Sequence, residues 1–303
     1  MRNVKSNKTS LFFKCSFFFF VLILLCVSCG KAEHDSNAEE EIPIDYSFFI
    51  AGHTYGTPGV DNEGVHPPFK NKFDFIQDDE SLNFGVFTGD IVPVGTTQNW
   101  DEIDQDIQEL ALPVYFTAGN HDITDRALYE SRYGQSYYSF TNHSDLFIVL
   151  DPNIDAWNIS GDQLVFLENV LNSEAQNANN IFVFFHQLLW WEPDNIYQNV
   201  ALNSLAGRAD TINFWSGIEP LFTELSNPVH LFAGDVGAFS TGSEFMFHQY
   251  DNITLIASGM GGNVRDNFVI IDVYDDGSIG YRLIALNDPD ETALGKIEDY
   301  ILP

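Results

Sequence analysis

The sequence predicts an α/β domain, and two features of its apolar residues support that prediction. Short continuous runs of β-branched and aromatic residues recur along the chain, as in strands that are buried on both faces. Between them lie segments with an apolar residue at every third or fourth position, as in amphipathic helices. This alternation of strand and helix indicates right-handed crossovers and mostly parallel pairing.

Five of the apolar runs lead into residues that can bind a metal. These runs are 48–50, 86–89, 114–119, 181–185 and 231–234. In the same order they lead to His53, to Asp90, to Asn120, His121 and Asp122, to His186, and to Asp235. Because ligands bind outside the carboxyl ends of strands in open α/β sheets, these side chains are expected to converge. The sequence therefore predicts one polar site that is suited to a metal.

Helices and a hairpin account for most of the remaining pattern. Helical spacing is found in residues 100–110, 161–171 and 218–225. Ser160 and Gln163 have the form of a capping box at the start of the second helix. Near the C-terminal end, Asp276-Gly277 lies between two apolar runs, 267–273 and 279–286, which is a strong hairpin signal.

Residues 1–28 have the layout of a secretory signal peptide. A basic segment precedes the apolar run 17–27, which is too short to span a bilayer as a helix. The run ends in a small residue followed by Cys29, which resembles a bacterial lipoprotein processing site. An ordinary cleaved signal with an incidental cysteine is the alternative. We expect a lipoprotein of the bacterial cell envelope, anchored in the membrane through lipidated Cys29, on the outer membrane or at the surface.

Composition narrows what the rest of the chain can do. Residues 29–41 are predicted to be an acidic tether, and residues 42–303 a single domain. The three cysteines all lie before residue 30, which excludes disulfides, thiolate metal sites and a cysteine nucleophile in that domain. The formal net charge of −31 excludes a nucleic-acid partner, because polyanions are repelled.

The order of the polar motifs resembles that of the calcineurin-like metallophosphoesterases. Gly89-Asp90 comes first, then Gly119-Asn120-His121-Asp122, and then His186 after a strand. The similarity extends over residues 46–285, including the turn at 259–262. The resemblance implies one domain, a four-layer α/β/β/α sandwich of two mixed sheets, with a two-metal site at the strand ends. It also implies hydrolysis of a phosphate mono- or diester by metal-activated hydroxide.

The resemblance also implies a role for each site residue. Asp90 is the carboxylate that bridges two divalent metals, drawn from Mn, Fe, Zn and Co. Asn120 and His186 ligate the second metal. His121 hydrogen-bonds the phosphate or protonates the leaving oxygen, and Asp122 orients it.

Two positions depart from the family pattern. Ala51 stands where the family has Asp, and Gly237 stands where it has His, while Asp235 replaces another His. The second metal keeps four ligands, but the first keeps only His53 and the shared Asp90, fewer than the three of catalytic zinc sites. We expect one tightly held metal and at most a weak second one, unless the loop after His53 completes the first site. That loop offers Tyr55, Asp61, Glu63 and His66.

Other functions remain open at this stage. The missing ligands suit a catalytically inactive descendant that binds a phosphorylated or glycan ligand, whereas the retained residues 120–122 favour chemistry. A glycosidase is weakly supported, since no acid pair stands out from the acidic background. Trp190 and Trp191 suit a substrate pocket or the core equally. For His66, His143, His230 and His248 a structural or surface role is favoured.

Overall fold

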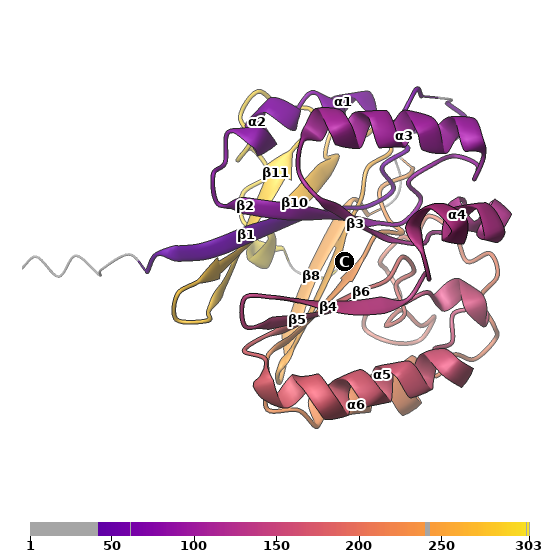
Figure 1. The fold of residues 1–303 in the computed structure, drawn as a ribbon, viewed down its shortest axis with the longest axis vertical. Helices are drawn as coiled ribbons and strands as arrows, with labels where there is room; N and C mark the ends of the chain where they lie inside the picture. The colour runs from indigo at the N-terminus through magenta and orange to yellow at the C-terminus, as the bar shows by residue number, and fades with distance from the viewer. Residues whose placement is uncertain (1–41, 61, 240–242, 301, 303) are drawn as a thin grey trace, which may run out of the picture. The chain divides into compact units, whose positions relative to one another are not determined.

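Two mixed β-sheets lie face to face at the centre of the domain (Figure 1). The first has the order β11-β10-β1-β2-β3 and the second β4-β5-β6-β7-β9-β8. The strands of the first sheet are β1 (Ile44–Ala51), β2 (Leu82–Thr88), β3 (Val114–Thr117), β10 (Asn267–Tyr274) and β11 (Ile279–Ala285). Those of the second are β4 (Tyr138–Asn142), β5 (Asp145–Val149), β6 (Ile181–Phe184), β7 (Val229–Ala233), β8 (Phe245–Tyr250) and β9 (Ile253–Ser258).

This computed structural model describes residues 42–60, 62–239, 243–300 and 302, which belong to one compact unit. The predicted signal peptide, Cys29 and the acidic tether lie outside the described residues, as does Asp61. Within the described part of the chain, no helix has the length and apolar character needed to cross a membrane.

Helices cover the outer faces of both sheets, which makes four layers (Figure 1). The helices are α1 (Pro67–Lys70), α2 (Phe73–Gln77), α3 (Thr97–Leu110), α4 (Arg126–Tyr133), α5 (Gly161–Glu174) and α6 (Glu219–Thr223). Short 3₁₀ or π turns are η1 (Asp122–Asp125), η2 (Pro152–Ile154), η3 (Ala175–Asn177), η4 (Phe214–Ile218) and η5 (Ile297–Asp299). In Figure 1, α1 to α3 lie over the first sheet, and α5 and α6 lie over the second.

In the first sheet, pairing is parallel from β1 to the edge strand β3 and antiparallel from β1 to β11, whereas in the second sheet it is parallel in the middle and antiparallel at both edges. β1 pairs in parallel with β2, and β2 with β3, while β5, β6, β7 and β9 follow one another in parallel. β10 and β11 form the predicted antiparallel hairpin. The predicted fold class, a four-layer sandwich of two mixed sheets, is confirmed.

Phenylalanines fill the space between the two sheets. Phe48 of β1 stacks on Phe84 of β2, with 5.2 Å between ring centroids. It also meets the edges of Phe147 and Phe182 from the second sheet, at 5.4 Å and 5.0 Å. Edge contacts of this kind add to the burial of large apolar area. This core fixes the two sheets together, so that strand ends from both can contribute to one site.

The capping box predicted for α5 does not form. The hydroxyl of Ser160 donates to Asp155 Oδ2 at 2.5 Å, so it does not cap the helix. Gln163 instead binds the backbone of Asp151, accepting from its N–H at 2.6 Å and donating to its carbonyl at 3.1 Å. The prediction was wrong because both side chains found partners in the preceding loop, which the local pattern does not show.

Candidate metal centre

Asp90, His186 and Asp235 meet at the carboxyl ends of β2, β6 and β7. One possible ligand atom from each lies within 4.8 Å of the others. His186 Nε2 lies 3.3 Å from Asp90 Oδ2 and 3.8 Å from Asp235 Oδ1. All three side chains are buried. The two sheets therefore build one centre, with Asp90 from the first sheet and the other two residues from the second.

Gly89 allows the two sheets to approach this closely. Its φ of +84° lies in the region that favours glycine, and a Cβ there would be 2.5 Å from Nδ1 of His186. Asp90 follows with a φ of 52°, which is uncommon for a residue with a side chain. The turn after β2 is thus shaped to hold the His186 ring against the backbone and to aim Asp90 at the same point.

Three histidines at this site have their Nδ1 atoms held by backbone carbonyls. His186 contacts the carbonyl of Thr88 at 2.9 Å, and His53 that of Met260 at 2.9 Å. His121 contacts the carbonyl of Pro93 at 2.7 Å. Because a carbonyl only accepts, Nδ1 carries the proton in each ring, and Nε2 is left for the site. Metal-binding histidines are oriented in this way.

The centre fits a divalent metal. His186 Nε2 and Asp235 Oδ2 are buried without a hydrogen-bond partner, although buried polar atoms are normally paired. Their lone pairs point to a group that the protein itself does not supply. Imidazole nitrogen and carboxylate oxygen suit Zn, Mn, Fe or Co.

Burial and mutual attraction set the charges of the three residues. Burial by itself lowers the pKa of His186 and raises that of Asp90, but the attraction between the two outweighs it. The pKa of His186 is therefore raised and that of Asp90 lowered. Burial raises the pKa of Asp235 to about 7. Binding a metal here requires His186 and Asp235 to lose their protons.

A cavity of about 520 Å³ opens onto this centre. His53, Asn120 and His121 line it together with Asp90 and Asp235. His53 Nε2 lies 3.8 Å from Asp90 Oδ2, and burial lowers the pKa of His53 to about 4. The structure thus brings every predicted site residue except Asp122 to the buried group or to the cavity wall.

Asp122 holds the backbone rather than the His121 ring. Its Oδ1 accepts from the N–H groups of Ile91 and Val92, at 2.8 Å and 3.1 Å, and its Oδ2 accepts from Gly119 at 2.8 Å. The expectation that Asp122 directly orients His121 is therefore wrong, since the carbonyl of Pro93 does so. Asp122 is fully buried, and burial, reinforced by the charge of Asp90, raises its pKa to about 7.

A model of the calcineurin-like phosphoesterase family matches residues 52–259. The chain belongs to that family. Its fold is similar to a purple acid phosphatase from yellow lupin (Lupinus luteus) seeds, with a TM-score of 0.59 and 15% identity over 81% of this chain and 52% of the other. It is also similar to a putative 5'-nucleotidase from Staphylococcus aureus, with a TM-score of 0.51 and 12% identity over 81% and 55%.

The chain spans about half the length of these two structures, and at such identities the likeness shows the fold alone. Comparison with curated proteins gives no match. The family consists of phosphoester hydrolases that use divalent metals, and Asp90, His186 and Asp235 form a possible ligand group for one.

One ligand position of the pattern expected from the sequence has no room for a side chain. Gly237 stands where a histidine was expected, and its φ is +84°. A Cβ there would be 2.6 Å from the carbonyl carbon of Gly259, so a side chain at this position would require the backbone to move. The ring of Tyr55 lies 4.2 Å from His53 and 5.1 Å from His121, centroid to centroid.

The loop after His53 gives the first metal position no charged ligand among its described residues. Glu63 is exposed, and His66 is buried with its Nε2 3.3 Å from Oδ2 of Asp266. Tyr55 is the only one of the four candidates that lines the cavity in the part of the chain that the structure describes.

The remaining residues singled out in the sequence lie elsewhere. Trp190 is fully buried in the core, whereas Trp191 is half-buried under the guanidinium of Arg208. The three other histidines are His143, which is exposed beside Asp45, His230, which is buried against Tyr281, and His248, which lines a second pocket. The second pocket could not be predicted from a local sequence pattern, because the residues that line it come from distant segments of the chain.

Proposed function

We propose that this protein is a metal-dependent phosphoesterase that hydrolyses a phosphate mono- or diester with one tightly held divalent metal. The observation that carries this proposal is the buried group Asp90, His186 and Asp235, with two unpartnered ligand atoms at the base of an open cavity. Membership of the family supports the reaction class.

These three residues would hold the metal, and Asn120, which lines the same cavity, would be a fourth ligand. When bound, the metal would act as a Lewis acid toward the phosphate and lower the pKa of water. Among the described residues that line the cavity there is no Lys or Arg. Neutralisation of the phosphate charge would therefore fall to the metal and the imidazoles, which favours a substrate with few phosphate charges.

His121 is placed to move a proton. Its Nδ1 is fixed by the Pro93 carbonyl, and its backbone N–H donates to Asp90 Oδ1 at 3.0 Å. Only Nε2 remains to face a substrate, so it is the atom that would protonate the leaving oxygen. Asp122 supports this arrangement by fixing the backbone of Gly119 and Ile91 on either side.

Hydrolysis assays on the full chain test the proposal. The protein would be loaded in turn with Mn, Fe, Zn and Co and assayed on a panel of phosphomonoesters and phosphodiesters. We expect turnover of at least one ester class, and none in Asp90→Ala. No hydrolysis by any metal-loaded preparation would contradict the enzyme assignment.

The closed position at Gly237 favours one alternative, a catalytically inactive descendant that binds a phosphorylated or glycan ligand. A side chain at Gly237 would require the backbone of Gly259 to move. A metal-loaded protein that binds a phosphorylated glycan but hydrolyses no ester would establish this alternative.

We also propose that the domain is anchored at the bacterial cell envelope through a lipid on Cys29. The sequence supports this with a basic segment, an apolar run and a small residue before the cysteine. Cys29→Ser should release or mislocalise the protein without changing its unfolding midpoint. Mass spectrometry of the native protein that finds no lipid, or cleavage at another residue, would contradict the anchor.

A further inference from the structure

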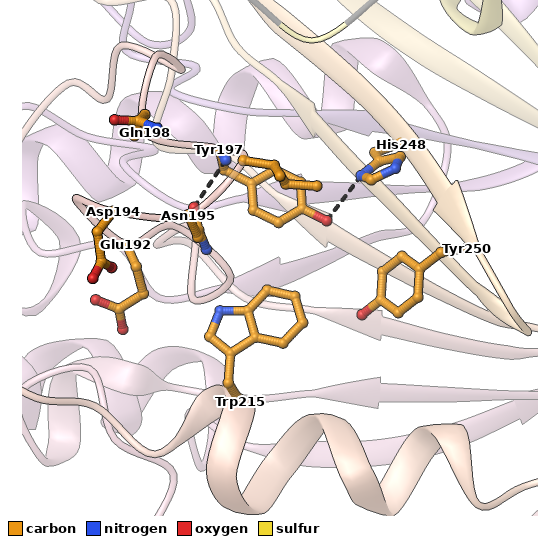
Figure 2. Close-up of a pocket in the computed structure, with 9 residues that line it drawn as sticks. Glu192, Asp194, Asn195, Tyr197, Gln198, Trp215, His248 and Tyr250 are labelled. Atoms are coloured by element: carbon orange, nitrogen blue, oxygen red, sulfur yellow. Dashed lines mark hydrogen bonds between the residues drawn. The ribbon is translucent and has the colours of Figure 1, made fainter.

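A second pocket, of about 740 Å³, has walls made of aromatic rings. Tyr197 comes from the loop after β6, Trp215 from η4, and His248 and Tyr250 from the edge strand β8 (Figure 2). No residue is common to its lining and that of the cavity at the metal centre. The second pocket therefore needs a function of its own.

The rings form a broad surface. Tyr197 and Trp215 are nearly parallel, with 12° between their planes and 6.0 Å between centroids. Trp215 and Tyr250 are 6.4 Å apart and tilted by 37°. Figure 2 shows the three rings next to one another with their faces turned largely toward the viewer. Tyr197 is buried, whereas Trp215 and Tyr250 are half-buried, so these two rings offer their faces to a ligand that is itself broad and partly apolar, with Tyr197 packed beside Trp215.

The polar atom of each ring is already engaged by the protein. Tyr197 Oη lies 2.9 Å from His248 Nδ1, Trp215 Nε1 donates to the Trp190 carbonyl at 3.1 Å, and Tyr250 Oη donates to Glu219 Oε1 at 3.2 Å. These contacts fix the rings before any ligand arrives, which reduces the entropy lost on binding. What remains for a ligand is the apolar surface of the rings.

The charges around the pocket exclude some ligand classes. No Lys or Arg belongs to its lining among the described residues, so an anion has no partner. Arg208 pairs with Glu192 at 2.6 Å, which compensates that carboxylate. Asp194 and Gln198 are exposed at the edge, where Figure 2 shows both to the left of Tyr197. For a cation, the pocket offers one carboxylate without a positively charged partner, that of Asp194. The aromatic rings form an open surface and do not enclose a cation as an aromatic cage does.

We propose that this pocket binds a neutral sugar unit of a carbohydrate. A sugar ring has an apolar face of C–H groups, whose positive hydrogens suit the negative face of an aromatic ring. Its hydroxyls at the ring edge would meet the polar groups of Asp194 and Gln198. This inference does not depend on the phosphoesterase activity, since it concerns a separate set of residues.

Calorimetric titration of the full chain tests the proposal, with maltoheptaose, chitotetraose and methyl α-mannoside as probes. We expect at least one of them to bind. Loss of a stacking ring is worth about 1.4 kcal/mol, so Tyr250→Ala should raise that Kd about tenfold. Tyr250→Phe keeps the ring and should bind within about twofold of the parent protein. Phe239→Ala removes an exposed aromatic ring at the other cavity and should leave the Kd unchanged.

Three results would overturn the proposal. The first is that none of the three sugars binds to a chain whose unfolding midpoint is normal. The second is that Tyr250→Ala and Phe239→Ala weaken sugar binding equally, which would place the sugar elsewhere. The third is that tetramethylammonium binds instead and that Asp194→Asn abolishes its binding, which would identify a cation site.

Discussion

The two halves of the family's metal site have diverged within this chain. Where Asp90, His186 and Asp235 meet, the ligand atoms are buried and close to one another, and two of them, His186 Nε2 and Asp235 Oδ2, have no hydrogen-bond partner. Around His53, the neighbouring positions hold Gly237 with backbone packed against it and the ring of Tyr55. In the proposed one-metal site, one metal position is lost without the other, because the shared carboxylate of Asp90 belongs to the intact half.

Removing one histidine from each half should have opposite results. His186→Ala should abolish tight metal binding, because it deletes the only imidazole of the intact group. His53→Ala should leave tight binding in place, since His53 is not part of the ligand group and contacts it through Asp90, at 3.8 Å. Metal content after dialysis, measured by mass spectrometry, compares the two. Equal loss in both variants would show that the halves act as a unit.

His121 should separate chemistry from metal binding. His121→Ala should lower turnover by about 10²–10⁴, the usual range for a lost general acid, and keep the metal. His143→Ala, which changes an exposed histidine beside Asp45, should leave turnover unchanged. If His121→Ala has the turnover of the parent protein, His121 is not the proton donor.

Metal affinity should depend on pH through Asp235. Burial raises its pKa to about 7, so below that pH a proton competes with the metal for the carboxylate. Below pH 7, each pH unit should lower the metal affinity by about tenfold more than it does above pH 7, because one additional proton must be released when the metal binds. Asp235→Asn keeps an oxygen donor without the titration and should lose this extra slope. A slope that is identical above and below pH 7 would argue against a titrating Asp235.

Two glycines with similar φ angles test whether the position of Gly237 is closed to a side chain. Gly134, with φ +86°, has open space for a Cβ, whereas Gly237, with φ +84°, has the carbonyl carbon of Gly259 at 2.6 Å. Gly134→Ala should lower the free energy of unfolding by about 1–3 kcal/mol, because its backbone conformation is nearly restricted to glycine. Gly237→Ala should cost about 1–3 kcal/mol more, because of overpacking. Equal costs in urea unfolding would mean that this position is open.

Much of this architecture could be predicted from the sequence. Apolar runs that end in metal-binding residues located the strand ends, and the order of motifs indicated which family to expect. Those signals are local in the chain, so they are visible without a structure. They also identified the loss of ligands at Ala51 and Gly237.

The parts that could not be predicted depend on contacts between distant segments. Asp122 follows His121 directly, yet its carboxylate binds backbone N–H groups of Gly119, Ile91 and Val92. At Gly237 the sequence shows only that a ligand is missing, whereas the structure shows that a side chain there would require the backbone to move.

The number of tightly bound metals per chain tests the central claim most directly. Native mass spectrometry of the metal-loaded full chain should show one tightly held ion, and at most a weak second one. In Ala51→Asp a third donor joins His53 and Asp90, and three protein ligands are what catalytic zinc sites use, so occupancy of the weak position beside His53 should rise. Two ions held equally tightly by the parent protein, or none, would contradict the asymmetric centre.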